Sequence, residues 1–185
     1  MGKMTQPKFR EDKVTQVAAL FLKMSGGHMN HLKLMKLLYL ADRESLIKWG
    51  RPIVFDYYVS MGQGPVLSQT LNLMHGETPA AEFWNKLISP SQNYEVRLLG
   101  EFDTGQLSKA EEKLVQEIYS KFGQFTQWQL VEYTHTLPEY KDPNGSSVPI
   151  LYKEVLKGAG KSDKDISSII NELDNIGLMD RIMFS

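Results

Sequence analysis

One run of apolar residues constrains the fold more than any other part of the sequence. Its members are spaced at i, i+3, i+4 and i+7, and they are Leu34, Leu37, Leu38 and Ala41. Such a stripe on a helix must be covered by another apolar surface. Tyr39 can place its ring on the same core and its hydroxyl at the edge. The spacing predicts a core helix over residues 31–47, capped by Asn30 and ended by Trp49-Gly50.

Most of the remaining chain also has helical periodicity, interrupted by Gly and Pro. Helices are expected over residues 10–24, 66–74, 80–88, 108–122, 126–137, 150–156 and 162–176, the last with Gly177 just past its end. Short extended segments are expected over residues 53–60, 93–102 and 178–184. The sequence therefore predicts a mainly α fold with short extended segments, forming a single helical domain.

The turn Gly62-Gln63-Gly64-Pro65 separates the first extended segment from the next helix. Gly64 suits a positive φ, and Pro65 suits the first turn of a helix that begins near Val66. A phosphate-binding loop is not expected, because neither G-x-G-x-x-G nor a following Lys-Ser/Thr is present.

Composition excludes several classes of protein. The chain has no Cys, which removes disulfides and thiolate nucleophiles, and no apolar run of about 18 residues that would span a membrane. A cytoplasmic location is therefore expected. The net charge is −1, which argues against general nucleic-acid binding. Residues 1–51 nevertheless carry ten Lys and Arg against four Asp and Glu, a net charge of +6, and the plainer interpretation is a solvated basic helix pair.

No pattern of residues indicates an enzyme or a bound metal. The motifs G-x-S-x-G and H-E-x-x-H are absent. His28 and His31 are three residues apart, but a zinc site needs further ligands that the neighbouring sequence does not supply. No catalytic residue, metal or cofactor is expected; a hydrolase built from scattered His and Asp side chains is a distant alternative.

Aromatic residues in the segment 53–60 indicate a contact surface. In an alternating strand Phe55 and Tyr57 share one face and Tyr58 lies on the other, so one face belongs to the core and the other is available to a partner. Aromatic residues and Met are favoured at interface centres. The residues expected to bind a partner are Tyr57, Tyr58 and Met61, with Lys33 and Lys36 giving electrostatic complementarity.

A series of motifs resembles a known family. The run Lys33–Ala41 (KLMKLLYLA) is followed by Gly50-Arg51-Pro52-Ile53, Phe55-Asp56 and Gly64-Pro65-Val66. This series resembles the Panacea domain, also called the SocA-like antitoxin domain, over residues 10–155 and most closely over residues 31–75. The positions that carry the motif are Leu34, Leu37, Leu38, Tyr39, Ala41, Gly50, Pro52, Phe55, Gly64, Pro65 and Val66.

The resemblance implies an antitoxin that neutralises a cognate protein toxin, encoded nearby on a prophage or other mobile element, by stoichiometric binding. It also implies a second mode of action, as an adaptor that delivers the toxin to a cellular protease. The expected organisation is a polar tail over residues 1–9, the Panacea-like domain over residues 10–155, and a C-terminal helical extension over residues 156–185 packed on the same domain.

The alternative is a DNA-binding regulator. Two successive helices, over residues 10–24 and 31–47, are separated by Gly26-Gly27 and invite comparison with a helix-turn-helix. The second helix would present Lys33, Lys36 and Arg43 to the groove. Its central run is very apolar for a recognition helix, so nucleic acid is not the expected partner.

Overall fold

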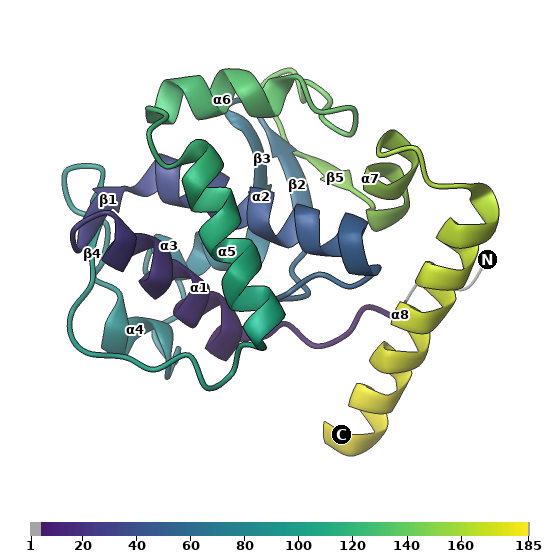
Figure 1. The fold of residues 1–185 in the computed structure, drawn as a ribbon, viewed down its shortest axis with the longest axis horizontal. Helices are drawn as coiled ribbons and strands as arrows, with labels where there is room; N and C mark the ends of the chain where they lie inside the picture. Colours follow the sequence, from purple (N-terminus) through teal and green to yellow (C-terminus); the bar gives the residue numbers. More distant parts are fainter. Residues whose placement is uncertain (1–4, 185) are drawn as a thin grey trace.

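The second helix of the chain forms the centre of the fold. The computed structural model describes residues 5–184, and within them α2 runs from His31 to Trp49 (Figure 1). The side chain of Asn30 accepts hydrogen bonds from the backbone N–H groups of Leu32 and Lys33. Gly50 ends the helix in the left-handed conformation, with φ of +69°. The expected core helix is confirmed, with the cap and the end at the expected residues.

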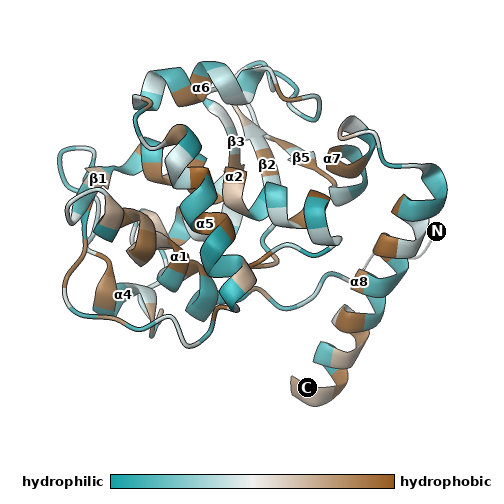
Figure 2. Cartoon of the chain, in the orientation of Figure 1, coloured by the Kyte–Doolittle hydropathy of each residue, from teal (hydrophilic) through white to brown (hydrophobic). Residues whose placement is uncertain are grey.

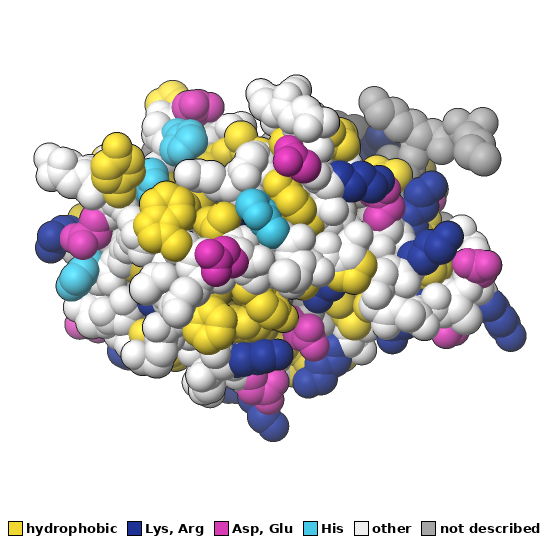
Figure 3. All heavy atoms as spheres, turned by 90° about the horizontal axis from the view of Figure 1, so that it is seen from above, with side chains coloured by type: hydrophobic (Ala, Val, Ile, Leu, Met, Phe, Trp, Pro, Cys, Tyr) yellow, Lys and Arg dark blue, Asp and Glu magenta, His cyan; other side chains and the backbone are white. Residues whose placement is uncertain are grey.

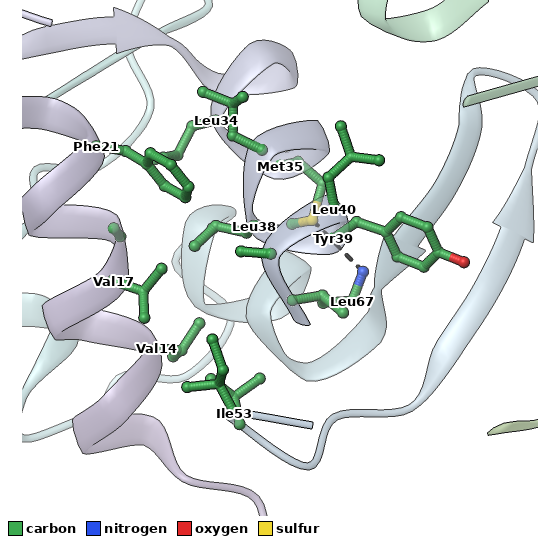
Figure 4. Packing of buried hydrophobic residues seen from close by; sticks show 14 of the residues in the cluster. Val14, Val17, Phe21, Leu34, Met35, Leu38, Tyr39, Leu40, Ile53 and Leu67 are labelled. Atoms are coloured by element: carbon green, nitrogen blue, oxygen red, sulfur yellow. Dashed lines mark hydrogen bonds between the residues drawn. The ribbon is translucent and has the colours of Figure 1, made fainter. Parts of the chain in front are cut away.

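α1, from Glu11 to Met24, packs an apolar face against α2 in this core. Figure 4 shows Val14, Val17 and Phe21 of α1 directed toward Leu34 and Leu38 of α2. All these side chains are buried. The predicted stripe is confirmed, because Leu34, Leu37, Leu38 and Ala41 are all buried, and the ring of Tyr39 is buried beside them.

Three short antiparallel strands form a sheet in the order β3-β2-β5. They are β2 (Tyr58–Met61), β3 (Gly64–Leu67) and β5 (Val148–Ile150). The turn Gly62-Gln63 joins β2 to β3, and Gly64 has the expected positive φ, at +100°. The extended segment is a regular strand only from Tyr58, because Phe55 has φ of +58° and interrupts any earlier alternation.

The expected helix start at Pro65 and Val66 is wrong. Both residues lie in β3, where they pair with Ser60 and Val59, and α3 runs only from Ser68 to Met74. β3 is an edge strand that pairs, within the described chain, only with β2. Pro is tolerated there because no further strand on its open side needs the N–H group that Pro lacks.

A second, two-stranded sheet pairs β1 (His28–Asn30) with β4 (Glu95–Arg97). The strand expected over residues 93–102 is shortened because Asn93 and Tyr94 both have positive φ. The helix expected over residues 80–88 is reduced to α4, Trp84–Leu87. β1 was not expected from the sequence; its partner lies more than 60 residues away in the chain.

Two helices with the expected N-caps cover α2. α5 runs from Lys109 to Phe122, with the Ser108 side chain accepting from the N–H of Glu111. α6 runs from Gln127 to His135 and has the expected capping box between Thr126 and Gln129. α5 contacts α1 and α2, and α6 contacts α2 and β3 (Figure 1).

The C-terminal region is more helical than expected. α7 runs from Tyr152 to Gly158, so the boundary expected at residue 155 falls inside a helix. α8 runs from Asp163 to Phe184, so the helix end at Gly177 and the extended segment 178–184 are both wrong. Figure 2 shows hydrophobic residues recurring along α8 as far as its C-terminal end.

Gly177 has a packing role instead. The N-terminal segment crosses α8 at this position, where a Cβ on Gly177 would overlap the backbone oxygen of Thr5. The backbone N–H groups of Thr5 and Lys8 donate to the carboxylates of Asp174 and Asp180, each at 2.9 Å. Residues 5–8 therefore lie along α8 rather than forming a loose tail, and residues 1–4 of the expected tail lie outside the described residues.

The described chain thus has eight helices and five strands of three or four residues. One contiguous cluster of buried side chains joins α1, α2, the three-stranded sheet, α5, α6 and α7. The mainly α, single-domain fold expected from the sequence is confirmed.

Candidate functional site

The outward face of the three-stranded sheet carries apolar side chains that are exposed or half-buried. In antiparallel strands, paired residues lie on the same face. Val59 of β2 pairs with Val66 of β3 and with Pro149 of β5. Tyr57, Val59 and Met61 alternate with the buried Tyr58 and Ser60. We define the outer sheet face as Tyr57, Val59, Met61, Pro149 and Leu151.

Part of this face is accessible to solvent. Tyr57 is 56% exposed and Leu151 is 47% exposed. A hollow of about 600 Å³ lies beside them, between the sheet and α8, and is also lined by Val59, Pro149 and Ile170. Of the expected contact residues, the structure brings Tyr57 and Met61 to this face. Val59 could have been predicted for this face, because it lies two residues after Tyr57 in the same extended segment. Pro149 and Leu151 could not, because they reach the face only through the pairing of β5 with β2.

Lys36 is not a contact residue in this conformation. Its side chain is fully buried, and its Nζ donates to the backbone oxygen of Pro65 at 2.8 Å. Burial lowers the pKa of Lys36 to about 7. The expectation of a surface charge here is wrong, because the β2–β3 hairpin and α6 cover the side of α2 that the helical pattern leaves polar.

Tyr58 is also a core residue rather than an anchor for a partner. Its hydroxyl donates to Oδ2 of the fully buried Asp42 at 2.7 Å. Its ring packs between those of Tyr39 and Tyr152, with centroid separations of 5.2 and 4.9 Å. Since a buried hydroxyl needs a hydrogen-bond partner, the Asp42 carboxylate is what allows Tyr58 to face inward.

Lys33 is partly buried and supports a neighbouring helix. Its Nζ donates to the backbone oxygen of Gly123 at 2.6 Å, just past the last residue of α5. A cation at this end stabilises the helix dipole. Burial lowers the pKa of the Lys33 ammonium from its ordinary value. The structure therefore gives Lys33 an intramolecular role.

Two buried carboxylates hold the chain between α2 and α3. Asp42 Oδ1 accepts from the backbone N–H of Val54, and burial raises the pKa of Asp42 to about 7. Asp56 accepts from the backbone N–H groups of Gln69 and Thr70, which lie in the first turn of α3. Burial raises the pKa of Asp56 as well. These carboxylates position the segment that leads to Tyr57, and Phe55 and Pro52 of the same segment are buried.

A buried network ties α2 to the loop after α6. Glu139 is 2% exposed, accepts from the hydroxyl of Tyr39 at 2.9 Å and pairs with the guanidinium of Arg43. Arg43 is therefore directed into the protein. With Lys36 buried and Lys33 bonded to α5, the basic side chains expected in a DNA groove point into the fold, and α2 is enclosed by its neighbours. The packing contradicts the helix-turn-helix interpretation.

The histidines make contacts within the protein. His28 Nδ1 lies 3.2 Å from a carboxylate oxygen of Glu95, and His31 Nδ1 lies 2.7 Å from the hydroxyl of Ser91. The ring of His135 stacks on that of Tyr140. In residues 5–184, no three His, Asp or Glu side chains are grouped as ligands of a metal ion.

The view from above α6 shows hydrophobic side chains in separate patches among polar and charged ones (Figure 3). Trp128 of α6 is 56% exposed, the same fraction as Tyr57, but it does not line the hollow beside α8. It therefore serves as a matched control for Tyr57. No helix within residues 5–184 combines the length and the apolar character needed to cross a bilayer.

Comparison with known proteins agrees with the motif series. Neither curated proteins nor solved structures give a significant match to the chain. The family model described as "Antitoxin SocA-like, Panacea domain" matches residues 34–141, which extend from the core helix α2 to the loop after α6 and include Tyr57, Val59 and Met61. The match covers more than half of the chain, and the chain therefore belongs to the SocA-like antitoxin family of Panacea-domain proteins.

Proposed function

We propose that this protein is an antitoxin that neutralises a protein toxin, encoded next to it, by stoichiometric contact through the outer sheet face. Family membership supports the class of function. The position of the contact rests on one observation, an apolar face on which Tyr57, Pro149 and Leu151 are exposed and Val59 and Met61 are half-buried.

The chemistry of the outer sheet face suits a protein partner. Tyr offers a large contact area with few rotatable bonds, and interface centres are enriched in aromatic residues and Met. The hydrogen bond from Tyr58 to Asp42 fastens the sheet behind Tyr57 to α2. A partner docking here would also meet the hollow beside α8, which gives a protruding side chain somewhere to insert.

The proposed contact differs in part from the expectation drawn from the sequence. Tyr57 and Met61 are kept as anchors. Lys36 and Tyr58 are no longer proposed as contact residues. Val59, Pro149 and Leu151, which lie on the same face as Tyr57, take their place in the proposed contact. Lys33 contributes through the stability of α5 rather than through direct attraction of the partner.

Binding by itself suffices for neutralisation in this proposal, with no reaction carried out by the antitoxin. Delivery of the bound toxin to a protease would use the same contact. That adaptor role is tested separately, by comparing the half-life of the toxin in cells with and without the antitoxin.

The test is a binding titration of the purified adjacent gene product with wild-type protein, Tyr57→Ala and Trp128→Ala. Truncation of a central anchor typically weakens binding by about 2 kcal/mol or more, roughly 30-fold. We expect that loss for Tyr57→Ala with an unchanged melting temperature, and no loss for Trp128→Ala. Equal binding by the two variants would contradict the proposed surface, and the absence of any complex with the wild-type protein would contradict the proposed function.

A further inference from the structure

A second cavity, separate from the hollow beside α8, lies between α2, α3 and the β2–β3 hairpin. Its volume is about 340 Å³, within the usual range of small-molecule sites. Its apolar lining is formed by Leu32, Met35, Met61, Val66, Leu71 and Met74.

The polar groups of this cavity are donors or bases, and none is acidic. They are Lys36, His31, His75 and Gln63, and no Asp or Glu lines the cavity. His75 lies 3.9 Å from a carboxylate oxygen of Glu77, and Glu77 does not line the cavity. The cavity therefore has an electrostatic preference for an anion.

The ammonium of Lys36 has bonding capacity left for a ligand. An ammonium carries three N–H donors, and within residues 5–184 the structure gives Nζ one acceptor, the backbone oxygen of Pro65. No salt bridge in the described chain includes Lys36. A buried cation without a counterion is costly, so an anion at this point would be strongly stabilised.

Gly64 lets the hairpin backbone pack close to the Lys36 ammonium. It lines the cavity and has φ of +100°. A Cβ built on Gly64 would stand 3.1 Å from Lys36 Nζ and 2.7 Å from the hydroxyl oxygen of Thr134. The hairpin backbone therefore approaches Lys36 more closely than any residue with a side chain would allow.

We propose that this cavity binds a small apolar monocarboxylate, whose chain lies along the Met and Leu side chains and whose carboxylate accepts hydrogen bonds from Lys36 Nζ. The apolar lining accounts for the chain, and the unmatched ammonium accounts for the carboxylate. Burial lowers the pKa of Lys36, as expected for a buried ammonium that has no carboxylate beside it in the described chain. This site is independent of the proposed toxin contact, although Met61 borders both surfaces.

The probe is sodium decanoate below its micelle concentration at pH 6, below the pKa of about 7 that burial gives Lys36, and decanol is the uncharged control of equal chain length. Protein labelled with ¹³C at the methionine methyl groups reports on the cavity through Met35, Met61 and Met74. Met179 and Met183 lie on α8, away from the cavity, and report on non-specific association. We expect saturable shifts at the three cavity methyls, with decanoate binding about tenfold or more tightly than decanol.

Two variants and one control separate the site from general hydrophobic binding. Lys36→Met should remove the preference for decanoate over decanol, and Leu71→Trp should fill the cavity and abolish the binding of both. Lys48→Met, on the exposed side of α2, should bind decanoate as the wild type does. The proposal is overturned by any of three results: no shifts at the cavity methyls, equal affinity of wild type for the two probes, or shifts of similar size at Met179 and Met183.

Discussion

Lys36→Met is the substitution whose effect on stability follows most directly from the structure. Met has nearly the length of Lys but carries no charge, so the variant removes a buried ammonium without leaving a large cavity. Burial lowers the pKa of Lys36 from 10.5 to about 7 in the folded protein. At about 1.4 kcal/mol for each pH unit, keeping this group charged costs the folded state on the order of 5 kcal/mol.

The sign of the pH dependence follows from proton binding. Between pH 7 and 10.5 the unfolded chain holds a proton on Lys36 that the folded chain has released, so wild-type stability rises with pH across that window. Below pH 7 both states are protonated and the full cost applies. Lys36→Met also leaves the backbone oxygen of Pro65 without its donor. The lost hydrogen bond costs the variant about 1–3 kcal/mol and so reduces the stability gained by removing the buried charge.

We therefore expect Lys36→Met to be more stable than wild type by about 2–4 kcal/mol at pH 6, and to lose this advantage as the pH approaches 10. The assay is urea unfolding at several pH values, read as the difference in unfolding free energy between variant and wild type. Lys48→Met, half exposed on the same helix, should give a flat difference near zero. A flat difference for Lys36→Met over pH 6–10 would refute the assignment of Lys36 as a buried, uncompensated cation.

Three further predictions concern packing and metal dependence. Leu37→Ala should lower the unfolding free energy by about 2–5 kcal/mol because Leu37 is fully buried in the core; a loss under about 0.5 kcal/mol, measured by urea unfolding, would contradict that position. Gly177→Ala should displace the N-terminal segment from α8 because a Cβ there overlaps the backbone of Thr5; faster amide exchange at Thr5 and Lys8 would show this, and unchanged exchange would contradict the crossing. Treatment with a chelator should leave the melting temperature unchanged, and a clear fall would revive a metal site at His28 and His31.

Features that depend on nearby residues were predictable from the sequence. The apolar stripe of α2, the Asn30 cap and the Thr126–Gln129 capping box are each encoded within a few residues, and all three were confirmed. The alternation around Tyr57 and Tyr58 correctly indicated one buried and one exposed face. It did not show that Tyr58 is the buried residue and Tyr57 the exposed one.

Features that depend on distant segments were not predictable in the same way. Lys36 has the spacing of a surface residue, but the β2–β3 hairpin covers it, and the sequence alone does not place that hairpin. Gly177 has the local character of a helix end, but its neighbour is Thr5, about 170 residues earlier. Pro149 and Leu151 join the outer sheet face only because β5 returns to pair with β2.

The measurement that tests the proposed function most directly is growth rescue by co-expression with the toxin encoded next to this gene, with the level of each protein quantified. Stoichiometric neutralisation predicts that rescue appears only when the antitoxin reaches at least the level of the toxin. Rescue should then track complex formation, with wild type and Trp128→Ala rescuing and Tyr57→Ala failing at matched levels. Rescue at strongly substoichiometric levels, with no complex detected, would show that the protein acts catalytically and would contradict neutralisation by binding.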